Sequence, residues 1–130
     1  EIPGHTQGSI AVYFKEKKLL VTSDGANAAT WLYLPESTDL AAYSRSLHKL
    51  EKYDFESILT GHSLKLFGRK DLENWIHVAE HPGFSHAKEQ KGGDFAPGVR
   101  PLQVWAEDDP KHKGPSVMID PDKEGIRSRL

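Results

Sequence analysis

A chain of 130 residues is long enough to fold as one domain, and 37% hydrophobic with 28% charged residues is typical of a globular protein. This composition excludes a disordered or membrane-embedded chain, and the net charge of −2 favours neither a nucleic acid nor an anionic membrane as partner. The chain has no cysteine, which excludes disulfides and thiolate metal sites, so that any metal ligands must be His, Asp or Glu. We expect a cytoplasmic protein, with which the lack of cysteine is compatible.

The N-terminal residues predict a loop followed by a β-hairpin. His5 stands between two glycines, directly before the alternating apolar run Ile10–Phe14, which is typical of a half-buried strand. A polar turn at Lys15–Lys18 leads to a second apolar run, Leu19–Thr22, which is followed by Asp24. Because a hairpin returns the chain to its starting level, we expect Asp24 to lie near His5.

A helix and a third strand follow. Ser37–Asp39 supplies N-cap residues, and the helix should run to about Tyr53. Its apolar positions recur at intervals of three and four: Leu40, Tyr43, Leu47 and Leu50. His48 lies off this stripe and is expected to be solvated. The third strand, Phe55–Thr60, leads to His62, so that strand, helix and strand form an α/β crossover.

The stretch between Gly25 and Pro35 has two interpretations. It is either a loop whose Trp31 and Tyr33 pack on the core, or a segment whose aromatic side chains line a substrate pocket, since aromatic walls are typical of small-molecule sites.

A second helix is predicted around Leu72–Ala79, where apolar residues follow helical spacing, and it should stop at Pro82. His77 and His81 lie four residues apart on it, as in a chelating pair, but no third ligand is close in sequence, and a partly exposed helix face is the alternative.

The C-terminal third combines a long loop with a strand pair. Residues 82–101 show no periodicity and predict a loop, whose His86 either reaches a site or is exposed. Leu102–Ala106 and Ser116–Asp120 read as two paired strands, and Asp122–Leu130 is expected to fray or to end at an interface.

Two histidines and one aspartate each stand at a strand end, where a rigid support can hold a metal ligand. Imidazole nitrogens with one carboxylate oxygen suit zinc and related divalent metals. The alternative is that His5 and His62 are loop residues and Asp24 is a turn former before Gly25.

Three motifs carry a resemblance to a known family: Pro3–Ile10, Leu19–Asp24 and Ile58–Ser63. In this order they resemble the second half of metallo-β-lactamase-fold hydrolases, the superfamily that includes glyoxalase II. The resemblance covers residues 1–130 as a single domain. It implies an α/β (or α+β) fold forming half of a four-layer αββα sandwich, with a mixed β-sheet covered by helices.

The resemblance also implies a site. His5, Asp24 and His62 would be metal ligands, with Asp24 as the catalytic, bridging residue between up to two metals, most often zinc and in some cases iron or manganese. The chain departs from the family pattern at Ser23 and Ser63, where glycine is usual, and the family's H-x-H-x-D-H motif is absent from the sequence. Since the chain begins with Glu1 rather than Met, we expect a processed, truncated or excerpted polypeptide.

The resemblance therefore implies a hydrolase of small-molecule esters, thioesters or amides that needs an N-terminal half. The alternative is a non-catalytic metal-binding or interaction fragment. In either case the inner sheet face would be apolar and open, so we expect a partner polypeptide with the missing motif, or a homo-oligomer.

Overall fold

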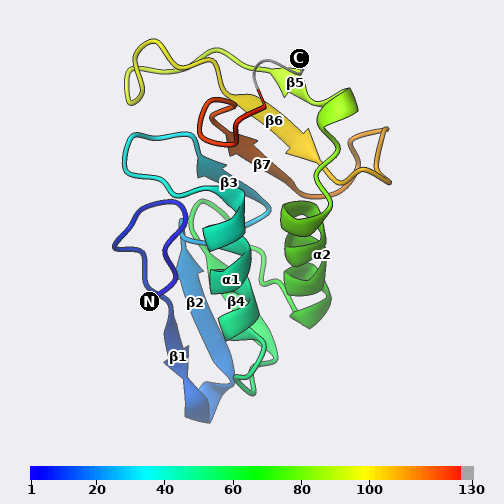
Figure 1. Cartoon of the computed structure of the whole chain (residues 1–130). Coiled ribbons are helices and arrows are strands. Elements are labelled where there is room, and N and C mark those ends of the chain that lie inside the picture. Colours follow the sequence, from blue (N-terminus) through cyan, green and yellow to red (C-terminus); the bar gives the residue numbers. More distant parts are fainter. Residues whose placement is uncertain (127–130) are drawn as a thin grey trace.

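The computed structural model describes residues 1–126 and has the mixed α/β content that the sequence predicts (Figure 1). Its strands are β1 (Val12–Phe14), β2 (Leu19–Ser23), β3 (Ala29–Leu32), β4 (Ser57–Thr60), β5 (Lys88–Glu89), β6 (Leu102–Trp105) and β7 (Ser116–Ile119). Its helices are α1 (Leu40–Leu50) and α2 (Arg69–Glu80), with single 3₁₀ turns at Lys15–Lys17 and Phe84–His86. Neither helix in this described part is long and apolar enough to cross a membrane.

The strands form two mixed sheets. One has the order β1-β2-β4, in which β2 pairs antiparallel with β1 and parallel with β4. The other has the order β3-β7-β6-β5, in which only β3 and β7 are parallel. Helix α1 lies in the crossover between the parallel strands β2 and β4, as the sequence predicts, and β3 precedes α1 in the same crossover.

One hydrophobic core joins both sheets to both helices (Figure 1). Alternate residues of the strands point into it, among them Leu20, Ile58, Val104, Val117 and Ile119. The helices meet them with apolar side chains at helical spacing: Tyr43, Leu47 and Leu50 from α1, and Leu72, Trp75 and Ile76 from α2. The buried hydroxyl of Tyr43 lies 2.9 Å from the Thr30 hydroxyl, which ties α1 to β3.

The opposite face of the β1-β2-β4 sheet is apolar and open. Val12 and Phe14 of β1 are 44% and 47% exposed. Their partners in register, Val21 and Leu19, are half-buried, as is Leu59 of β4 beside Val21. Since side chains alternate along a strand, these residues share the face that the helices do not cover.

Two strands lie where the sequence pattern did not place them. Residues 29–32 form β3 rather than a loop, because they pair in parallel with β7, more than 80 positions later in the chain. Within the long loop predicted for residues 82–101, Lys88–Glu89 pairs antiparallel with β6. A local sequence pattern reveals neither of these two pairings.

The predicted fraying of Asp122–Leu130 is wrong for the part that the structure describes, and residues 127–130 lie outside it. Ile126 is buried in the core. Glu124 accepts a hydrogen bond from the Leu40 amide at 2.7 Å, and Lys123 donates to the Ser37 carbonyl at 2.9 Å. These contacts hold the segment against the start of α1.

His48 is not simply solvated, as the sequence led us to expect. Its Nδ1 lies 2.5 Å from Oε1 of Glu51, and its Nε2 contacts Glu80 of α2. Hydrogen bonds to Glu51 and to Glu80 raise the pKa of His48 above its ordinary value of 6.5. Since a neutral imidazole has a single N–H, both contacts are satisfied together only by the protonated ring.

We predict that His48→Gln lowers stability at pH 6 more than at pH 9. A raised folded-state pKa contributes stability that is full below the unfolded value of about 6.5 and is lost as pH rises through the folded value. The loss should not exceed about 1 kcal/mol, because the group is half exposed. Thermal unfolding followed by circular dichroism at both pH values measures this loss of stability. A loss of equal size at pH 6 and pH 9 would contradict the raised pKa of His48.

Candidate functional site

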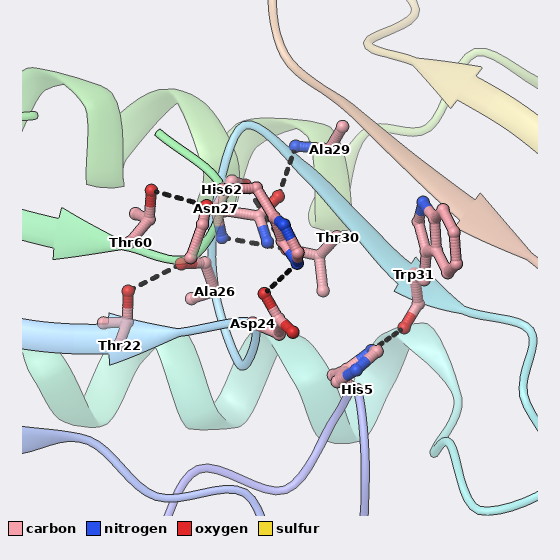
Figure 2. A network of polar contacts seen from close by, with 11 residues as sticks. His5, Thr22, Asp24, Ala26, Asn27, Ala29, Thr30, Trp31, Thr60 and His62 are labelled. Atoms are coloured by element: carbon pink, nitrogen blue, oxygen red, sulfur yellow. Dashed lines mark hydrogen bonds and ion pairs between the residues drawn. The ribbon is translucent and has the colours of Figure 1, made fainter. Parts of the chain in front are cut away.

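The parallel strands β2 and β4 end at one edge of their sheet, where they place Asp24 beside His62 (Figure 2). The Gly61 amide donates to the Ser23 carbonyl at 2.9 Å, which locks the two strand ends together. His62 Nε2 lies 3.2 Å from Asp24 Oδ1. Of the three residues expected at a site, these two are in direct contact.

The backbone at both strand ends adopts the left-handed conformation. The backbone φ angles are +51° at Ser23 and +62° at His62, values that residues other than glycine rarely adopt. Such strain persists where the surroundings impose it and is frequent at functional sites.

The loop that carries His5 is attached to β3 and to the segment before α1. His5 Nδ1 lies 2.8 Å from the Trp31 carbonyl oxygen, and the Ser37 hydroxyl donates to the His5 carbonyl at 2.6 Å. A carbonyl oxygen only accepts, so Nδ1 carries the proton and, in the neutral ring, Nε2 keeps a free lone pair. This is the arrangement in which proteins prepare histidine for a metal.

His5, Asp24 and His62 all line one pocket of about 450 Å³, and Figure 2 shows Asp24 between the two histidines. Asn27 is the fourth polar side chain of the lining, and Gly61 forms part of the floor. The remaining lining residues are apolar: Ala29, Trp31, Leu34 and Phe95.

Trp31 and Tyr33, the two aromatic residues expected at a substrate pocket, lie at different places relative to the pocket. Trp31 lines the pocket and is 40% exposed. Tyr33 is only 3% exposed and packs in a small cluster with Leu34 and Ala96, its ring centroid 5.5 Å from that of Trp31. Tyr33 therefore supports the pocket wall from behind and does not form it.

His5, Asp24 and His62 have the ligand atoms that a divalent metal prefers, and the Asp24–His62 pair also has a suitable spacing. Two ligands of a tetrahedral zinc, bonded at ~2.0–2.2 Å, lie roughly 3.3–3.5 Å apart, close to the Asp24–His62 separation of 3.2 Å. Within residues 1–126, no group of three or more His, Cys, Asp or Glu side chains is already arranged to hold a metal. His5 lines the same pocket but does not form such a group with the pair.

The other candidate histidines lie elsewhere. His77 is paired with Asp108 at 3.0 Å, and His81 lies 3.7 Å from Glu107, so the turn after β6 supplies the carboxylates that the sequence did not reveal. The two rings are 5.0 Å apart. His86 does not reach the pocket and contacts His112, which stacks on Trp105.

Asn27 and Phe95 are among the pocket residues that the sequence did not indicate. Asn27 is held in the turn after β2, where its side chain accepts from the Ala29 amide at 2.7 Å. Phe95 is a lone aromatic in a glycine-rich stretch of the long loop. An aromatic residue in a loop without periodicity was the one available signal, and it does not identify a location.

No family model matches the chain, and no curated protein matches it. The function proposed below therefore rests on the geometry of the pocket.

We predict that Gly61→Ala destabilises the protein by about 1–3 kcal/mol, because its new methyl group would collide with the Asp24 carboxylate. Gly93→Ala, which adds a methyl group in open space, is the matched control. Urea unfolding measures both. Adding Asp24→Ala to Gly61→Ala should recover part of the loss, and a loss that stays unchanged would place the collision elsewhere.

Proposed function

We propose that this chain is the metal-binding half of a metallo-β-lactamase-fold hydrolase that acts on a small-molecule ester, thioester or amide. The observation that supports this most is the meeting of three motifs in one pocket. His5, Asp24 and His62 come from separate stretches of sequence, yet all line the same 450 Å³ pocket at strand ends. The strained backbone at Ser23 and His62 adds support.

In this proposal His5 Nε2, His62 and Asp24 hold the metal, with zinc the best match to two imidazoles and a carboxylate, and iron or manganese as substitutes. A bound metal lowers the pKa of a coordinated water, which supplies hydroxide near neutral pH. The chain's own contribution is orientation: the Trp31 carbonyl fixes the His5 ring, and Gly61 leaves room for the Asp24 carboxylate.

The open face of the β1-β2-β4 sheet supports a partner. We propose that it is covered, in the cytoplasm, by a polypeptide that carries H-x-H-x-D-H and completes a second metal position, or by a second copy of the chain. The same face favours the second candidate function, a non-catalytic metal-binding or interaction fragment. A partner that brings the missing ligands would distinguish the hydrolase from it.

We expect zinc-loaded protein to retain about one metal per chain after desalting at pH 8, and less at pH 5, because protons compete for imidazole. Asp24→Asn should lose more metal than His5→Ala or His62→Ala, since an amide offers one neutral acceptor in place of two charged oxygens. Elemental analysis measures the content.

His48→Gln, remote from the pocket, is the control for this metal measurement. Unchanged metal content in all three pocket variants would contradict the proposed metal site, and equal losses would show that Asp24 contributes no more to metal binding than either histidine.

We also expect the purified chain to self-associate or to bind a partner through the open face. Each large apolar side chain that becomes buried there contributes roughly 1.5–3 kcal/mol. Light scattering over a dilution series should show an assembly that dissociates in the double variant Val12→Thr, Phe14→Ser. These side chains are already exposed, so the variant should fold. A monomer at every concentration, with no partner in intact mass spectra, would contradict the expectation.

A further inference from the structure

The pocket wall contains an exposed aromatic ring whose position is fixed from behind. Trp31 packs against buried Tyr33, and its carbonyl holds His5. At 40% exposure, the indole presents a large apolar surface to the pocket. Trp75 and Trp105 are buried, whereas Trp31 is the exposed tryptophan of the chain. Packing in the core therefore does not account for the position of its indole.

A second aromatic side chain reaches the same pocket from the loop between β5 and β6. Phe95 is 75% exposed, although its neighbour Ala96 is buried against Tyr33 and Leu34. The Ala96 amide donates to the Gly93 carbonyl, and the Val99 amide to the Ala96 carbonyl, both at 3.2 Å. The loop is therefore attached to the pocket wall at Ala96 while the Phe95 ring is left in solvent, an arrangement that a bound apolar group would satisfy.

The charges around the pocket select against anions. Asp24 is the one carboxylate of the lining, and no lysine or arginine of residues 1–126 lines the pocket. An anionic group entering the metal-free pocket would therefore meet a carboxylate and no permanent cation to compensate it. Ala29 and Leu34 extend the apolar part of the wall.

We propose that this pocket binds an uncharged group that carries an aromatic or similarly bulky apolar part, contacted by Trp31 and Phe95. For the proposed hydrolase the inference gives only the apolar part of the substrate, since a bound metal would add positive charge to the pocket, and it rests on that function only in taking the pocket as the substrate site. A volume of about 450 Å³ is in the range of small-molecule pockets and accommodates a phenylalkyl amide.

The test uses metal-free protein, prepared with EDTA, and three probes: 4-phenylbutyramide, butyramide and 4-phenylbutyrate. Isothermal titration calorimetry at pH 8, supported by ligand-observed NMR for weak binding, gives the dissociation constants. We expect the phenyl amide to bind at least tenfold more tightly than butyramide, and severalfold more tightly than the carboxylate. In Asp24→Asn the difference between amide and carboxylate should shrink.

Single substitutions show whether the phenyl amide binds at Trp31 and Phe95. Phe95→Ala and Trp31→Ala should each weaken the phenyl amide about tenfold, whereas Phe14→Ala, which removes an exposed ring on the open sheet face, should not change it. Circular dichroism checks that each variant is folded. Equal binding of the two amides, equal binding of amide and carboxylate, or an equal effect of Phe14→Ala would overturn the proposal.

The probe experiment contains no metal, so it is independent of the proposed hydrolase. Zinc binding without phenyl selectivity would leave the hydrolase standing and overturn this inference. Phenyl selectivity without zinc binding would do the reverse.

Discussion

The parallel pairing of β2 with β4 is the constraint on which the candidate site depends. The pairing continues to the last residues of both strands, where the Gly61 amide donates to the Ser23 carbonyl at 2.9 Å. Side chains that follow two parallel strands leave the sheet at the same edge, and so Asp24 and His62 come within 3.2 Å of each other. Helix α1 makes this possible, because parallel neighbours need a crossover that returns the chain to its starting edge.

The pocket lies where the two sheets approach each other. The first sheet supplies Asp24 and His62, whereas Trp31 comes from β3 of the second, and His5 joins them through the Trp31 carbonyl (Figure 2). The polar groups thus occupy the strand ends of one sheet and the aromatic wall belongs to the other. This separation gives the pocket one polar side and one apolar side, a division that suits a ligand with two chemically different parts.

Much of the fold was predictable because its signals are local. The apolar run Leu19–Thr22, the helical spacing of Leu40 to Leu50 and the stop at Pro82 all correspond to observed elements. What was missed depends on distant partners: β3 is a strand because of β7, and Phe95 reaches the pocket through a loop with no pattern. The motif residues His5, Asp24 and His62 pointed to one pocket through resemblance, since their spacing in sequence carries no local rule.

The pairing of β3 with β7 has a consequence for synthesis on the ribosome. Ala29–Leu32 emerges early, but Ser116–Ile119, its hydrogen-bonded neighbour, is translated more than 80 codons later. Contacts between positions so far apart form slowly, since closing a long loop costs entropy before the contact is made. During translation the first sheet can therefore assemble while Trp31 still lacks its framework, and in that interval the exposed strand edges are open to chaperones.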